Sequence, residues 1–226
     1  PKNLGMALGW NGLWGNLGLA FAAIVSGALM DLWGWRMAFF IPGVLSMAAG
    51  VGFLLLVKDP GPVPKKSKTI GLHLDSRTMT LIFSILLVAT ACGGVIFNST
   101  TVAMPKVFDE RLASLTQSSF GIGALVAFVY SLAALAQLAM GSLIDRFELR
   151  RLMIGIALIQ IPLLALAANL EGWAMLAAAL AMMLAVFGQI PLNDVIVGKY
   201  VADEYRARVL SVRYVVSLGV AAVAVP

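Results

Sequence analysis

Seven polar residues lie inside long apolar runs of the sequence, where their side chains could bind a solute. A polar group is unfavourable in hydrocarbon, so each must face a partner or a water-filled cavity. Several recur three, four or seven residues apart, which places each pair on one face of a helix. The alternative for each is a hydrogen bond between helices, worth about 0.6–2 kcal/mol. The seven candidates for a substrate pathway are Asn16, Asn98, Thr101, Tyr130, Gln137, Gln189 and Asn193.

Four of these candidates are expected to share one interior space rather than face lipid, because of their spacing and the unfavourable free energy of polar groups in hydrocarbon. The four are Asn98, Thr101, Tyr130 and Gln137.

The stretch GSLIDRFELRR combines a small residue, a carboxylate and a basic cluster at the end of an apolar run. Its glycine would let a neighbouring helix approach closely in lipid. Its aspartate falls at the membrane boundary, where an unpaired carboxylate is disfavoured and needs a partner. The pattern is more specific than an ordinary positive-inside loop, which would need only the arginines, and it singles out Gly141, Asp145, Arg146, Arg150 and Arg151.

The composition indicates that lipid is the natural solvent of this surface. Apolar residues make up 61% of the 226 residues and charged residues 12%, against about 45–50% and 25% in soluble domains. This excludes a soluble globular domain, a disordered chain and a nucleic-acid-binding protein. One Cys and one His exclude a disulfide framework and a His/Cys metal cluster, and we expect no cofactor.

Seven apolar runs are long enough to cross a membrane as helices, which takes about 20 residues each. The runs are apolar on every side rather than alternating, which excludes a β-barrel. The sequence therefore predicts an all-α membrane protein, a polytopic bundle of transmembrane helices. The predicted spans are residues 4–30, 37–57, 79–103, 118–144, 150–170, 173–193 and 208–226.

Residues 58–78 form the one long polar segment, and three prolines prevent a continuous helix in its first half. This segment divides the chain into residues 1–57, with two spans, and residues 79–226, with five. Both ends of the chain lie in or beside apolar runs, so we expect an internal piece of a longer protein.

Basic residues fix the expected orientation. The side of the membrane that holds the start of the first span also holds 13 of the 16 Lys and Arg residues. Because basic residues accumulate in cytoplasmic loops, this side is predicted to be cytoplasmic, and the polar segment 58–78 with it.

Three stretches together resemble the major facilitator superfamily of secondary transporters. The stretch Gly141–Arg151 is similar to the cytoplasmic signature of that family and departs from it at Ile144, Glu148 and Leu149. Gly27–Phe40 resembles the external turn between its fifth and sixth helices, and Tyr200–Tyr214 resembles the loop entering its eleventh helix. The resemblance implies helices five to eleven of twelve, with 58–78 as the linker between an N-terminal and a C-terminal half-bundle.

The resemblance also implies a function. It implies a permease that moves a small solute by alternating access, not an enzyme, in a bacterial-type plasma (inner) membrane, with coupling to protons left open. Its pseudo-symmetry would bring Asp145 to the start of the first span, Lys2 to Gly5, as a gate latch; a local pair with Arg146 or Arg150 is the alternative. A membrane scaffold or sensor that keeps the fold and transports nothing is the second functional class.

The polar segment 58–78 should be the first site of proteolysis in membranes. Trypsin should cut at its Lys and Arg residues only when it is added to the cytoplasmic side, because the prolines disfavour a protective helix there. Inside-out and right-side-out vesicles, read by immunoblot, give the measurement. Cleavage from the outside would contradict both the orientation and the span count.

Overall fold

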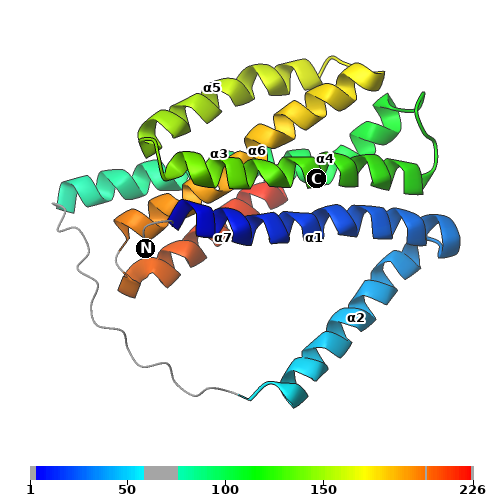
Figure 1. The fold of residues 1–226 in the computed structure, drawn as a ribbon, viewed down its shortest axis with the longest axis horizontal. Helices are drawn as coiled ribbons and strands as arrows, with labels where there is room; N and C mark the ends of the chain where they lie inside the picture. The colour runs from blue at the N-terminus through cyan, green and yellow to red at the C-terminus, as the bar shows by residue number, and fades with distance from the viewer. Residues whose placement is uncertain (1–3, 59–75, 202, 225–226) are drawn as a thin grey trace.

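The structure, a computed structural model, describes residues 4–58, 76–201 and 203–224. Within these ranges it is an all-α helix bundle (Figure 1), which confirms the expected fold class. Each of the seven predicted runs corresponds to one helix. The helices are α1 (Leu4–Trp33), α2 (Trp35–Leu56), α3 (Ser76–Arg111), α4 (Ser119–Ile144), α5 (Leu149–Ala167), α6 (Gly172–Tyr200) and α7 (Asp203–Ala224).

Six helices, α1 to α6, are long and apolar enough to cross a membrane when the described residues are considered. Helix α7 begins with charged residues, Asp203 and Glu204, and its role as a seventh span stays a prediction. Nearly all of the predicted linker 58–78 lies outside the described residues, and its last three residues form the first turn of α3.

Helix α3 is longer than the predicted span 79–103. It continues through Pro105 to Arg111, although proline removes one backbone hydrogen bond. Packing stabilises the extension, because Phe108 is fully buried and the guanidinium of Arg111 donates to the carbonyl of Ala168 at 2.7 Å. Tertiary contacts thus extend the helix beyond the apolar run that set the predicted span.

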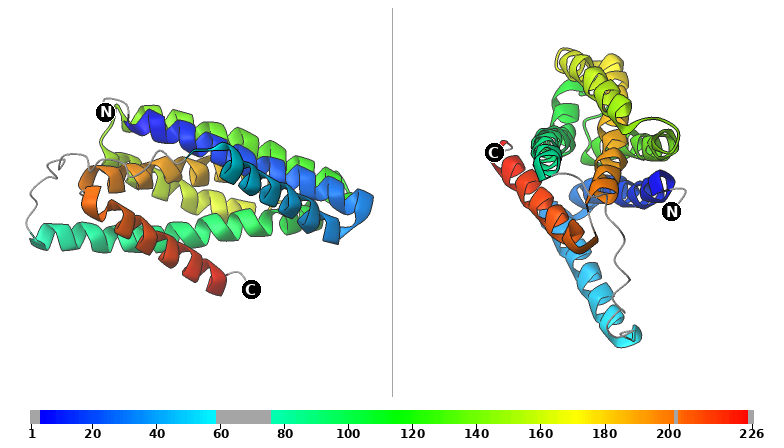
Figure 2. Two further views of the ribbon diagram at one scale, coloured as in Figure 1. Left: turned by 90° about the horizontal axis from the view of Figure 1, so that it is seen from below. Right: turned by 90° about the vertical axis from the view of Figure 1, so that its left-hand side faces the viewer.

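Helices α1 and α2 are joined through a single residue, Gly34, whose φ of 82° lies in the left-handed region that favours glycine. The turn directs α2 away from the rest of the bundle (Figure 2). Helix α2 buries none of its residues against the described chain. Since it is apolar all round, lipid or another helix must cover it in the membrane.

The main core lies where α1, α3, α4 and α6 meet. Aromatic side chains fill it: the ring of Phe187 lies 5.8 Å from that of Phe97 and 5.6 Å from that of Tyr130. A second buried cluster joins α4, α5 and α6 around Ile144, Ile156 and Leu192. These two clusters fix α4 and α6 as the centre of the bundle.

Candidate functional site

The most extensive helix contact in the described chain joins α1 and α4, which run antiparallel side by side (Figure 1). We call this contact the α1–α4 seam. At one end, a Cβ atom added to Gly5 would lie 2.6 Å from the carbonyl oxygen of Gly141, and one added to Gly141 would lie 2.7 Å from that of Gly5. At the other end, a Cβ at Gly27 would collide with the carbonyl of Ser119. Both ends therefore require glycine.

Beyond Gly141, the carboxylate of Asp145 reaches the start of α1. The backbone N–H of Gly5 donates to Asp145 Oδ1 at 3.1 Å and that of Met6 to Asp145 Oδ2 at 3.2 Å. These N–H groups belong to the first turn of α1 as described, where no carbonyl of the described helix accepts from them. We call this contact the Asp145 clamp. It is the contact that the family resemblance implied, whereas an ion pair of the same loop joins Arg151 to Glu148 at 3.0 Å.

An equivalent contact closes the opposite end of the seam. Asp31, near the end of α1, accepts from the backbone N–H of Ser119 at 3.2 Å and from that of Phe120 at 2.7 Å, in the first turn of α4. We call this contact the Asp31 clamp. Each helix thus caps the N-terminus of the other with a carboxylate from its own C-terminal end.

The two clamps are related residue by residue. Asp31 and Asp145 are 114 positions apart, and so are Gly27 and Gly141. The N–H donors of the two clamps, Gly5–Met6 and Ser119–Phe120, keep the same separation. The seam is therefore a self-complementary contact with local two-fold symmetry, of the kind found between inverted repeats of transporters.

Sequence reasoning missed Asp31, although a signal for it was present. The segments GALMD (27–31) and GSLID (141–145) share the pattern Gly-x-Leu-x-Asp at the ends of their helices. Comparing these two segments with each other would have identified the second carboxylate.

Gln137 lies in the middle of the seam. Its side chain is fully buried and packs over Gly12, where a Cβ atom would overlap the amide oxygen. Neither its Nε2 nor its Oε1 has a hydrogen-bond partner in the described chain. A buried amide without partners destabilises the closed seam by roughly 1–3 kcal/mol.

Thr101 and Tyr130 line a cavity of about 600 Å³ between α1, α3 and α4. The phenol of Tyr130 donates to the backbone carbonyl of Thr101 at 2.8 Å, and the hydroxyl of Thr101 donates to the carbonyl of Phe97 at 2.6 Å. Both hydroxyls therefore already bind the protein itself.

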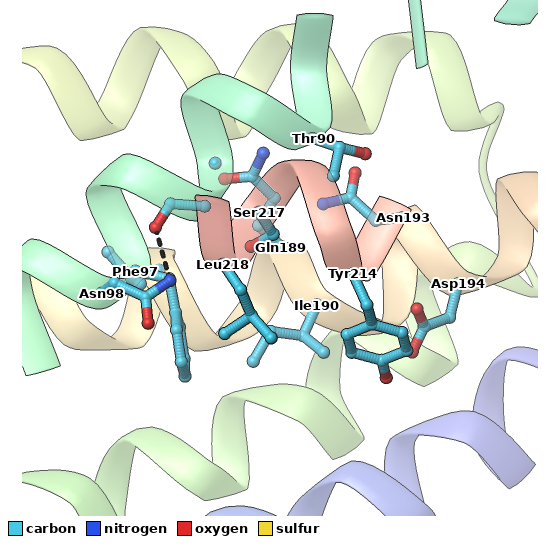
Figure 3. A pocket seen from close by; sticks show the side chains of 13 residues that line it. Thr90, Phe97, Asn98, Gln189, Ile190, Asn193, Asp194, Tyr214, Ser217 and Leu218 are labelled. Carbon is cyan, nitrogen blue, oxygen red and sulfur yellow. Dashed lines mark hydrogen bonds between the residues drawn. The ribbon is translucent and has the colours of Figure 1, made fainter. Parts of the chain in front are cut away.

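A second cavity, of about 250 Å³, lies between α3, α6 and α7 (Figure 3). Asn98, Gln189 and Asn193 line it, three of the predicted pathway residues from two different helices. The amide nitrogen of Asn98 donates to the carbonyl of Gly94 in its own helix at 2.8 Å (Figure 3). Asn16 is buried elsewhere, on the face of α1 that also carries Leu13 and Ala20.

The expectation of one interior space for four residues was wrong for the described cavities. Asn98 lines the smaller cavity, Thr101 and Tyr130 line the larger one, and Gln137 lines neither. Residues three or seven apart do share a helix face, but a broad face contacts two neighbouring helices. Tertiary packing therefore divides residues that the spacing groups together.

Replacing the close-contact glycines should separate α1 from α4. In Gly27→Val and Gly141→Val, the new side chain meets a backbone carbonyl that has no room to move, so the helices must part. Spin labels at the exposed positions Trp14 and Leu135 should report a longer distance by double electron–electron resonance. Gly18→Val is the matched control, because nothing lies within 4 Å of its Cβ position. An unchanged distance in both glycine variants would contradict the tight seam.

Comparison with known proteins gives one family match. The model of the Major Facilitator Superfamily matches residues 1–134, which include α1, α2, α3, the Asp31 clamp and the first part of α4. No curated protein and no solved structure matches the chain. The family match covers more than half of the sequence, and six described helices are able to cross a membrane. The chain is therefore a multi-pass integral membrane protein and belongs to the Major Facilitator Superfamily, a family of membrane transporters.

Proposed function

We propose that this protein moves a small solute across a bacterial-type plasma membrane by alternating access, and that the α1–α4 seam is the contact that opens and closes. The observation that carries this proposal is the pair of clamps at the two ends of one seam. Each clamp joins a carboxylate to a helix N-terminus, and both are engaged in this structure.

The strength of the clamps suits a gate. A carboxylate at an exposed helix N-terminus is held only weakly, and salt weakens the contact further. Both aspartates are exposed, so such a contact can break thermally without disturbing the helices themselves. Breaking the Asp145 clamp frees the side predicted to be cytoplasmic, and breaking the Asp31 clamp frees the opposite side.

Gln137 acts against the clamps, because it destabilises the closed seam. Its unpartnered amide destabilises the closed seam at the centre, whereas either opening would give it water or solute to bind. A closed state that is held weakly at both ends and destabilised in the middle exchanges readily with two open states. This balance is what alternating access requires, because a ligand shifts populations only between states of similar free energy.

Neutralising either aspartate should shift the equilibrium in a defined direction. Asp145→Asn should populate the cytoplasm-open state about 2- to 5-fold more, which corresponds to the loss of about 0.3–1 kcal/mol. Asp31→Asn should shift the population toward the opposite opening. Spin-label pairs measure both ends of the seam: Ala7 with Phe147 at one end, and Leu32 with Gln117 at the other.

Glu148→Gln is the matched control for this experiment, because Glu148 is an exposed carboxylate of the same loop whose ion pair is with Arg151. It should leave both distances unchanged. Each aspartate variant should lengthen the spin-label distance at its own end of the seam. If both variants opened the same end, or if neither changed a distance, the clamps would not act as gates.

Gln137→Ala should lower transport more than it lowers expression. Removing the unpartnered amide relieves the closed seam of a destabilising group, so the variant should melt at an equal or higher temperature while transporting more slowly. Leu135→Ala, at an exposed position of the same helix, is the control. A variant with normal transport and a lower melting temperature would show that Gln137 acts only in packing.

Transport itself is tested with the protein made from its complete gene and reconstituted in liposomes. Uptake of uncharged solutes is measured with and without a proton gradient. The proton gradient is varied because a carboxylate at mid-span is the usual proton carrier. Three carboxylates of the described helices lie instead in the outer turns or just beyond them: Asp31, Asp145 and Asp194. If the protein bound a solute and never released it on the other side of the membrane, the result would favour a sensor over a transporter.

A further inference from the structure

We propose that the cavity between α3, α6 and α7 binds a small uncharged solute that offers both hydrogen-bond donors and acceptors. This inference rests on the proposed transport function and names the class of solute. It is drawn from polar groups that the protein buries around this cavity without satisfying them.

Two cavity-lining side chains lack a partner in the described chain. Thr90 is 4% exposed and Asn193 is 7% exposed, and neither Thr90 Oγ1 nor Asn193 Oδ1 has a hydrogen bond. Figure 3 shows both at the cavity, one from α3 and the other from α6. Buried polar atoms are nearly always satisfied, so two orphans at one cavity indicate a molecule that binds between them.

The amide of Gln189 is a third polar group at the cavity, and Gln160 orients it toward α3. The amide nitrogen of Gln160 on α5 donates to Gln189 Oε1 at 2.8 Å, and Gln160 is itself 4% exposed. With its oxygen engaged, Gln189 presents its Nε2 to Gly93 on α3. A Cβ atom at Gly93 would lie 3.4 Å from this nitrogen and 3.9 Å from Asn193 Nδ2. The absence of a side chain at Gly93 therefore leaves room beside two amide donors.

The lining is nearly free of charge. Among the described residues that line this cavity, Asp194 is the one charged residue, and it already interacts within the protein. On these described walls a cationic solute would find no free carboxylate and an anionic solute no basic group. Transfer of an ion into such a site without a counter-charge is strongly unfavourable, whereas a neutral solute pairs with amides and a hydroxyl.

One side of the cavity is apolar. Phe97 lines it and packs on the buried ring of Phe187, and Ile190 and the exposed Leu218 complete this side. Tyr214 and Ser217 of α7 also line the cavity. Typical pockets for drug-sized ligands measure about 300–1,000 Å³, and this one is smaller, at about 250 Å³. The site thus fits a compact solute with one polar edge and one apolar face.

Binding is measured separately from transport, by the thermal stabilisation of the detergent-purified protein made from its complete gene. The neutral probes are D-mannitol and uridine, and the charged probes are D-gluconate and D-glucosamine. At least one neutral probe should stabilise the protein at millimolar concentration, and both charged probes should bind at least about 10-fold more weakly. Stabilisation by the charged probes alone would show that the site selects ions, and stabilisation by none of the four would leave a cavity that holds only water. Either result would overturn the inference.

Two variants locate the site. Asn193→Leu keeps the branched shape of the side chain and removes the amide, so the Kd of the bound probe should rise about 10-fold or more. Thr90→Val replaces a hydroxyl with a methyl group of similar size and should also weaken binding. It takes the place of Asn193→Leu in the test if that variant does not purify as a single species. Asn169→Leu, which removes an exposed amide at the end of α5, should leave the Kd unchanged. Equal affinity in all three variants would place the solute elsewhere.

The outcomes separate this inference from the proposed function. A neutral probe that binds through Asn193 and is never transported would support the site and contradict transport. Transport that is insensitive to Asn193→Leu would support the transporter and contradict the site.

Discussion

The close antiparallel contact of α1 with α4 is the constraint on which the rest of the structure depends. Lipid removes the hydrophobic driving force between helices, so association relies on backbone proximity and hydrogen bonds. Glycines at Gly5, Gly27 and Gly141 supply the proximity, and two aspartates supply the hydrogen bonds. Because each residue of one end has a counterpart 114 positions away at the other, a single local arrangement is used twice.

This symmetry has a mechanical consequence. A contact with equivalent ends has no built-in preference for opening on either side, so the bias must come from what differs between the ends. The departures from symmetry are therefore informative. Gln137 corresponds to Ala23 in the repeat, and only the glutamine brings an unpartnered amide into the seam. The basic loop after Asp145 has a single arginine, Arg36, as its counterpart after Asp31.

Polar groups away from the seam differ in whether they have hydrogen-bond partners. In the core of α3, α5 and α6, Gln160 donates to Gln189 Oε1, whereas Thr90 Oγ1 and Asn193 Oδ1 have no hydrogen bond in the described chain and lie at a cavity. A satisfied buried network rigidifies a bundle, and an unsatisfied one marks a place where another molecule can bind. The same amide chemistry thus holds helices together at one position and forms a candidate binding wall one turn away.

The sequence by itself determined the seven helices and the membrane environment, because these depend on composition, length and local charge. The contact of Asp145 with the start of α1 was expected from the family resemblance. The sequence also indicated which polar residues share a helix face. Only the tertiary structure decided which neighbour that face meets: Asn98 and Thr101 are three residues apart but line different cavities. It likewise revealed that Asp31 caps α4 and that Pro105 does not end α3. The physical reason is that periodicity is a property of one helix, whereas partners, cavities and unsatisfied groups depend on how helices distant in sequence pack together.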